Sequence, residues 1–197
     1  MKKVGLFFGT FNPIHVGHLI IANHIEEYSD LDEVWLVVTP HNPHKEKKTL
    51  LNDMHRYQMV EIALEDYPKL KASKIEFGLK QPNYTVITLV HLREKYPNYQ
   101  FSLIMGEDNL ENFHKWKNYE TIIENHDIYV YPRVFKTKKN NLKIDAKYLK
   151  KIHKLGAPIV EISSTFIRKS IKAKKNVRPL LSEKVWKYLD EMNFYKN

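Results

Sequence analysis

Short apolar runs alternate along the chain with longer stretches in which apolar residues recur every three or four positions. The short runs have the length of buried strands and are rich in Val, Ile and aromatic residues. They cover residues 3–8, 33–40, 70–77, 99–106, 127–133 and 158–162. The longer stretches have helical spacing, most clearly at residues 15–28, 53–66, 84–95 and in the last part of the chain.

This alternation predicts an α/β fold with a doubly wound parallel sheet. A length of 197 residues suits a single domain with one core, and we expect a small C-terminal helical part at about residues 163–197. Open parallel sheets bind ligands beyond the carboxyl ends of their strands. We therefore expect the functional residues to follow the strands directly.

Composition narrows the classes of protein that fit. The chain has no cysteine, which excludes disulfides and thiolate metal sites and fits a reducing cytoplasm. Its apolar runs are far shorter than the roughly 20 residues of a membrane span, and its N-terminus lacks a secretory signal pattern. The net charge of +9 is concentrated in residues 134–178, where 14 Lys and Arg face only Asp145 and Glu161. Such a segment is most often a solvated surface, although a patch that faces phosphates is the alternative.

The stretch "GLFFGTFNPIHVGH" contains the first candidate site. Gly9 ends a predicted strand, and a helix begins near His15. His15 and His18 lie about 60° apart on such a helix, so both imidazoles can face one spot beside the exposed N–H groups of the helix start. Paired imidazoles at that place can hold a polyphosphate. The alternative is that the two histidines merely occupy the start of a helix and bind nothing. A zinc site would need a third ligand, and none is nearby.

The full string "GTFNPIHVGH" resembles the signature of the nucleotidyltransferases that carry an HxGH motif. The resemblance implies a Rossmann-like fold in which both histidines bind the phosphates of ATP and stabilise charge in the transition state. It assigns ATP binding to Gly9, Thr10, Phe11, His15 and His18.

Later stretches are similar to the bacterial nicotinate-nucleotide adenylyltransferases within that superfamily. "TPHNPHKEKK" resembles the family's PHK loop and places His44 and Lys45 near a phosphate. "QPNYTVITL" resembles the segment in which a threonine, here Thr85, contacts the nicotinate. "HRYQMVEIAL" resembles the family's DRYxMVxLA helix, but His55 replaces the usual aspartate, which puts a capping or ion-pair role of this position in doubt.

Two further motifs complete the resemblance. "IMGEDNLENFHKW" matches the family pattern in which Asp108 binds ribose, Trp116 stacks on the pyridine ring and the backbone N–H of Lys117 meets the carboxylate. An aspartate at a strand end and an aromatic face suit these roles. "EISSTFIRKSI" matches the family's ISSTxIR segment, a capped helix start with a planar guanidinium for phosphate oxygens. Its implied ATP contacts are Ser163, Ser164, Thr165 and Arg168.

The resemblance implies adenylyl transfer from ATP to nicotinate mononucleotide in NAD biosynthesis, with His15, His18, Lys45 and Arg168 as the catalytic cations and donors. Mg²⁺ would arrive with ATP, since no carboxylate cluster indicates a protein-built metal site. The partners expected are ATP and nicotinate mononucleotide, with no nucleic acid and no membrane. The alternatives are an enzyme that prefers nicotinamide mononucleotide, a pantetheine-phosphate adenylyltransferase, or a nucleic-acid-binding module, and a homo-oligomer stays open.

Overall fold

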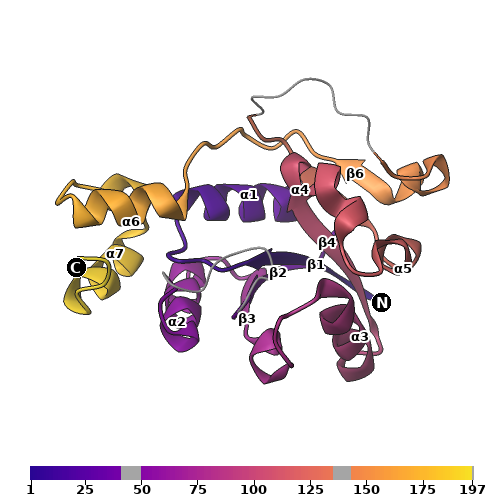
Figure 1. Ribbon diagram of the computed structural model, residues 1–197, viewed down its shortest axis with the longest axis horizontal. Coiled ribbons are helices and arrows are strands. Elements are labelled where there is room, and N and C mark those ends of the chain that lie inside the picture. Colours follow the sequence, from indigo (N-terminus) through magenta and orange to yellow (C-terminus); the bar gives the residue numbers. More distant parts are fainter. Residues whose placement is uncertain (41–49, 135–142, 197) are drawn as a thin grey trace.

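The computed structural model describes residues 1–40, 50–134 and 143–196 of the chain. The described part is built around a six-stranded sheet in the order β3-β2-β1-β4-β5-β6, in which all neighbouring strands are parallel (Figure 1). The strands are β1 (Lys2–Gly9), β2 (Glu33–Val38), β3 (Leu70–Ser73), β4 (Tyr99–Gly106), β5 (Ile128–Tyr131) and β6 (Ile152–Lys154). The predicted doubly wound parallel sheet is confirmed.

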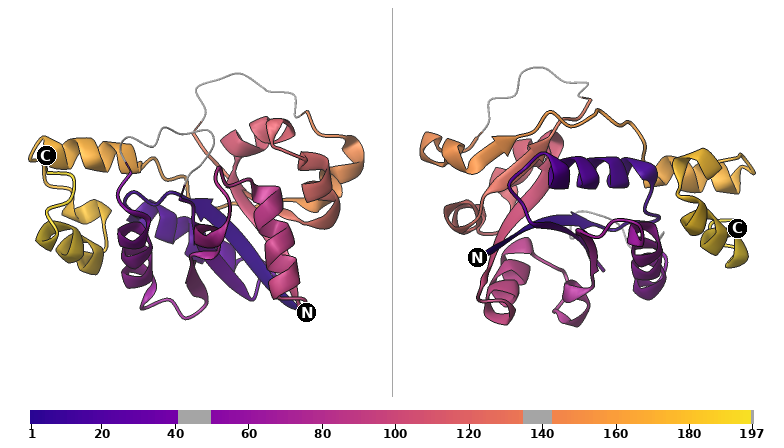
Figure 2. Two further views of the ribbon diagram at one scale, coloured as in Figure 1. Left: turned by 60° about the horizontal axis from the view of Figure 1, so that its bottom comes forward. Right: turned by 180° about the vertical axis from the view of Figure 1, so that it is seen from behind.

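Helices connect the strands and cover both faces of the sheet, with α1 on one face and α3 on the other (Figures 1 and 2). The helices are α1 (Val16–Glu27), α2 (Asp53–Leu64), α3 (Thr85–Lys95), α4 (Glu107–Asn112), α5 (Tyr119–Asn125), α6 (Ser164–Lys172) and α7 (Glu183–Glu191). The 3-10 segments are η2 (Ile75–Gly78), η3 (Phe113–Lys115), η4 (Ala146–Lys151) and η5 (Arg178–Leu180). The first three helices begin and end within two residues of the predicted bounds. The pattern does not predict α4 and α5, because helices of six and seven residues are too short to show a period.

Side chains alternate between the two faces of each strand and so build two separate apolar clusters. Along β1, Val4 and Leu6 pack on the side of α3, where Leu92 is buried. Phe7 points the other way and joins the cluster that contains Ile25 of α1. The sheet is therefore covered on both faces, which explains why its central strands read as continuous apolar runs.

The prediction of a strand at residues 158–162 is wrong. The edge strand is instead β6, which begins six residues before the predicted strand and pairs with β5. Pro158 has no N–H to donate to a sheet, and Ile159 is 61% exposed. The segment runs past the sheet instead, and Val160 and Ile162 line a cavity beside α1. The β-branched residues that suggested a strand thus serve as a cavity wall.

The order of the strands reverses between β1 and β4, which lie side by side at the centre of the sheet. β1 ends at Gly9 and β4 at Gly106, so the crevice beyond these two glycines is the expected ligand position for such a sheet. Helices α6 and α7 lie together at the end of the molecule that is remote from β6 (Figure 1). Within the described ranges, no helix is long and apolar enough to cross a membrane.

Candidate active site

A tight corner joins β1 to α1 and forms the floor of the site. Phe11 stands in it with a φ of 43°, in the left-handed region that side chains seldom adopt. Its ring packs over Gly9, where an added Cβ would meet ring carbons at 2.7 Å. The ring of Phe11 leaves no room for a Cβ, which explains why position 9 is a glycine. Gly9 and Phe11, both predicted to bind ATP, shape the corner but are absent from the cavity wall described below.

The two histidines of the motif stack on one another at the start of α1. The ring centroids of His15 and His18 lie 3.7 Å apart, with 25° between the ring planes. The backbone N–H of His15 donates to Nδ1 of His18 at 3.3 Å, so the neutral ring of His18 carries its proton on Nε2. Side chains of the two residues therefore meet at one spot, as the spacing predicts.

His15 is buried, and its charge state follows from that. Burial lowers the pKa of His15 to about 4, and the nearby positive charge of Arg133 contributes in the same direction. Its Nδ1 is buried without a hydrogen-bond partner in the described residues. His15 is thus a neutral imidazole at pH 7.

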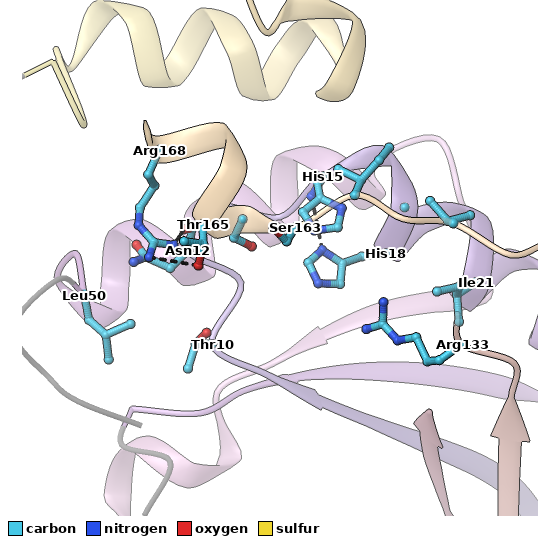
Figure 3. Close-up of a pocket in the computed structure, with 14 residues that line it drawn as sticks. Thr10, Asn12, His15, His18, Ile21, Leu50, Arg133, Ser163, Thr165 and Arg168 are labelled. Atoms are coloured by element: carbon cyan, nitrogen blue, oxygen red, sulfur yellow. Dashed lines mark hydrogen bonds between the residues drawn. The ribbon is translucent and has the colours of Figure 1, made fainter. Parts of the chain in front are cut away.

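A cavity of about 390 Å³ opens above this corner (Figure 3). Two segments far apart in the sequence form its walls, the corner of β1 with α1 and the start of α6. Seven of the residues predicted to bind ATP line it, namely Thr10, His15, His18, Ser163, Ser164, Thr165 and Arg168. The structure therefore brings both predicted phosphate motifs to one cavity.

The start of α6 is fixed to the corner by side chains of its own motif. The hydroxyl of Ser163 accepts the backbone N–H of Phe166 at 3.2 Å and caps the helix. The hydroxyl of Ser164 donates to the carbonyl of Pro13 at 2.8 Å. Nη1 of Arg168 donates to the carbonyl of Asn12 at 2.7 Å. These bonds hold the N-terminal amides of α6 at the cavity, a position that favours anions.

Arg133 also lines this cavity, although no motif in the sequence predicted it. It follows β5 directly, its guanidinium lies 5.3 Å from the centroid of the Tyr131 ring, and its Nε is 4.0 Å from Oδ1 of Asp108. That Nε is buried and makes no hydrogen bond within the described part of the chain. The signal available in the sequence was its place at the end of a predicted strand, because ligands bind beyond strand ends in such sheets.

A second cavity of about 390 Å³ lies beyond the ends of β1, β2 and β4. Thr85, Trp116 and Lys117, all predicted to bind the nicotinate nucleotide, line it together with Glu76 and Thr39. Trp116 is half-buried, with its ring edge-on to Phe113 at a centroid distance of 5.4 Å. An aromatic wall beside polar groups suits a heteroaromatic ring.

Asp108 lies outside the wall of the second cavity, although its neighbour Asn109 belongs to it. A Cβ at Gly106 would come within 2.4 Å of Oδ1 of Asp108, which explains the glycine at the end of β4. Since Asp108 pairs with Arg133 of the first cavity, this ion pair lies where the two cavities approach one another.

Arg56 is fully buried beneath the corner and fixes it through carbonyl groups. Its Nη1 donates to the carbonyls of Thr10 and, at 3.0 Å, of Thr39. Its Nε donates to the carbonyl of Leu51 at 3.1 Å, and its Nη2 pairs with Asp53 at 2.6 Å. One guanidinium thus joins the ends of β1 and β2 to α2.

The structure also accounts for His55, which stands where the resembling family has aspartate. Oδ1 of Asn52 caps α2 by accepting the N–H of Met54 at 2.9 Å, and Asp53 supplies the ion pair to Arg56. Nδ1 of His55 lies 2.9 Å from the hydroxyl of Tyr188 on α7. Neither capping nor ion pairing therefore depends on this position. His44 and Lys45 lie outside the described residues.

Comparisons with known proteins agree with this geometry. Residues 6–170 match the model of the family described as cytidylyltransferase-like. The chain is 68% identical over 195 residues to a protein of Christiangramia forsetii and 66% identical over 194 residues to one of Flavobacterium johnsoniae, both named probable nicotinate-nucleotide adenylyltransferase. The alignments cover 99% and 98% of this chain and 99% of each relative.

Solved structures share the fold. The nicotinic acid mononucleotide adenylyltransferase of Plasmodium falciparum in complex with NaAD superposes with a TM-score of 0.78 at 21% identity, over 100% of this chain and 98% of its own. The same enzyme in complex with APC gives a TM-score of 0.75 over the same shares of both chains.

Proposed function

The chain belongs to the nicotinate-nucleotide adenylyltransferases of the cytidylyltransferase-like family, and from that premise we propose how its two cavities divide the reaction. The reaction is the transfer of the adenylyl group of ATP to nicotinate mononucleotide, which gives nicotinate adenine dinucleotide and pyrophosphate in NAD biosynthesis. The observation that carries the assignment is the pairing of a donor-rich cavity with an aromatic-walled cavity on either side of the Asp108–Arg133 ion pair.

The cavity beside α1 takes the triphosphate of ATP. His15 and His18 present imidazole nitrogens to it, and Arg133 and Arg168 supply positive charge. The backbone amides at the start of α6 add further donors, placed by the Ser163 cap. The Nε of Arg133 is buried without a hydrogen-bond partner in the described residues, and it gains one when phosphate oxygens arrive.

The second cavity takes the pyridine end of the mononucleotide. The indole of Trp116 stacks on the pyridine ring, and Thr85 and the backbone N–H of Lys117 contact the carboxylate side of that ring. Asp108, half-exposed at the end of β4, accepts hydrogen bonds from a ribose. This orientation directs the 5′-phosphate of the mononucleotide toward the cavity beside α1.

The chemistry is an in-line displacement at the α-phosphorus of ATP. A 5′-phosphate oxygen of the mononucleotide forms the new P–O bond, while the bond from the α-phosphorus to the oxygen that bridges it to the β-phosphorus breaks. That electron pair leaves with pyrophosphate. Because the attacking phosphate is already ionised at pH 7, the protein needs no general base, and its work is alignment and charge neutralisation.

Magnesium does not fit a protein-held site in the part of the chain that the structure describes. No group of three or more His, Asp or Glu side chains converges there, and the charged side chains that line the ATP cavity are arginines. We propose that Mg²⁺ enters on the triphosphate oxygens. No step above is routed through it.

Three basic residues of the described C-terminal region make contacts within the fold, which favours an enzyme without a nucleic-acid partner. Lys151 pairs with Asp127 at 3.4 Å, Arg168 bonds to the corner, and the guanidinium of Arg178 lies 5.8 Å from the ring of Trp186. We place the enzyme in the cytoplasm, where a chain without cysteine meets a reducing environment. Retention of RNA or DNA on a filter at low salt, lost with rising salt, would contradict the proposal that the enzyme has no nucleic-acid partner.

Pyrophosphate release tests the proposal. The protein is incubated with Mg-ATP and, in parallel, nicotinate mononucleotide, nicotinamide mononucleotide or pantetheine phosphate, with a reaction lacking acceptor as the control. We expect release with the nicotinate compound to exceed that with the nicotinamide compound, and the product to have the mass of nicotinate adenine dinucleotide. Release with pantetheine phosphate alone would contradict the assignment.

A further inference from the structure

One buried carboxyl in the wall of the mononucleotide cavity has no part in the mechanism above. Glu76 belongs to η2 and is 1% exposed, yet it lines this cavity. The hydroxyl of Thr88 donates to its Oε1 at 2.7 Å, and its backbone carbonyl accepts from Nδ2 of Asn83 at 3.2 Å. Its Oε2 is buried and makes no hydrogen bond of normal geometry among residues 1–40, 50–134 and 143–196, although the hydroxyl of Thr39 lies near enough to the carboxyl to lower its pKa weakly. A buried polar atom left unpaired at a ligand cavity points to a partner on the ligand.

The surroundings of Glu76 favour its neutral form. Burial raises the pKa of the Glu76 carboxyl, and the hydroxyls of Thr88 and Thr39 oppose this shift more weakly. Strand β2 and helix α3 pack against η2, and Thr39 follows the first while Thr88 belongs to the second. Helix α2 also contacts η2, through the ring of Tyr57, whose centroid lies 6.1 Å from that of Phe77 and whose pKa burial raises to about 12. Neither of these two threonines titrates in the range in which enzymes work.

The other titratable side chains of the cavity are Tyr84, Lys115 and Lys117. The ammonium of Lys117 lies 4.6 Å from the centroid of the Tyr84 ring, so at least one cation stands at the wall. A substrate that bears a carboxylate is attracted by these two lysines and repelled by an ionised Glu76. The charge of the Glu76 carboxyl therefore bears on whether a carboxylate or a neutral amide is favoured on the pyridine ring.

We propose, on the basis of the function assigned above, that Glu76 is a specificity-determining residue: it is protonated in the substrate complex, and its Oε2–H donates a hydrogen bond to the carboxylate of nicotinate mononucleotide. A hydrogen bond to a charged acceptor is stronger than one to a neutral amide. This bond therefore stabilises bound nicotinate mononucleotide more than bound nicotinamide mononucleotide. Where the carboxyl is ionised before binding, solvent supplies the proton.

The test compares kcat/KM for the acid with kcat/KM for the amide in three variants. Glu76→Gln copies the protonated form, since its amide oxygen accepts from Thr88 and its NH₂ donates into the cavity. Glu76→Met keeps the length of the side chain and removes the donor. Thr88→Val removes the bond that holds Oε1 and leaves Oε2 in place. Circular dichroism and thermal melting establish that each variant is folded.

We expect the acid-to-amide ratio to stay within about threefold of wild type in Glu76→Gln and Thr88→Val, and to fall by about tenfold in Glu76→Met, the effect of losing one charge-assisted bond. A ratio that changes more than threefold in Glu76→Gln would show that the carboxyl is ionised in the complex and overturn the proposal. The proposal would also be overturned if the ratio stayed at the wild-type value in Glu76→Met, or if it fell as far in Thr88→Val as in Glu76→Met. If the wild type adenylates neither mononucleotide, the proposed function itself is wrong; an active wild type with an unmoved ratio contradicts only the role of Glu76.

Discussion

The imidazole of His15 lies flat against the imidazole of His18, with ring centroids 3.7 Å apart. Two protonated rings at this separation would repel each other strongly. Burial and Arg133 avoid this by lowering the pKa of His15 to about 4. We therefore expect His15 to meet phosphate as a neutral partner, and the arginines to supply the positive charge of the site.

This charge state predicts a pH dependence of stability. The pKa of His15 is about 4 in the folded protein and 6.5 in the unfolded chain, so below pH 6.5 the unfolded chain takes up a proton that the folded protein does not. The contribution of His15 is fully present above pH 6.5 and is lost as the pH falls to about 4, at a cost of about 3 kcal/mol. Urea unfolding of wild type and His15→Asn between pH 7.5 and 4 measures it. Parallel pH profiles of the two proteins would contradict the prediction.

We expect removal of the second histidine to affect catalysis rather than folding. His18 lines the cavity beside α1 and is half-buried. We expect His18→Ala to lower the turnover number by about 10²-fold, as for the loss of one preorganised donor to developing charge. His24→Ala is the matched control, because His24 stands in the last turn of the same helix and stacks on Tyr28. Steady-state rates at saturating substrates decide, and near-normal turnover of His18→Ala would refute the role.

Arg133 provides a prediction with two independent readouts. We expect Arg133→Met to lower kcat/KM for ATP by about tenfold or more, since a hydrogen bond to a charged group contributes about 1.5–3 kcal/mol. The same change removes a positive charge that lowers the pKa of His15, so that pKa should rise. An NMR titration of the His15 ring measures the second effect. Arg93→Met, on the exposed side of α3, should change neither quantity.

Arg56 predicts a large loss of stability. In Arg56→Met, the carbonyls of Thr10, Thr39 and Leu51 lose their common donor, and we expect the free energy of unfolding to fall by about 3 kcal/mol because buried acceptors are left unpaired. Urea titration compares this variant with wild type and with Arg93→Met. A fall in the free energy of unfolding of less than about 1 kcal/mol would mean that the corner between β1 and α1 keeps its structure without the guanidinium.

The sequence could predict those parts of the site that depend on local spacing. The convergence of His15 and His18 and the Ser163 cap depend on local spacing at a helix start, and the structure confirms both. His15 itself lies just before α1, with extended backbone, and not on the helix as the spacing argument assumed. Arg133 escaped because its relevance depends on β5 lying beside β4, a long-range pairing that no local pattern reveals. The strand predicted at residues 158–162 failed for a related reason, since β-branched residues suit a ligand cavity as well as a sheet.

Contacts between distant segments account for the rest. The hydroxyl of Tyr195 donates to Oδ1 of Asn12 at 2.6 Å, and His55 meets Tyr188. These bonds join the last part of the chain to the corner and to α2. Neither follows from residue type or spacing, because each depends on how the last part of the chain packs against distant segments, as α7 packs against α2.

The most direct test of the mechanism is a crystal structure with a non-hydrolysable ATP analogue. We predict that the triphosphate lies in the cavity beside α1, within hydrogen-bond distance of the imidazoles of His15 and His18 and of the N-terminal amides of α6. A triphosphate bound elsewhere, with both rings still stacked and the Nδ1 of His15 unpaired, would contradict the account.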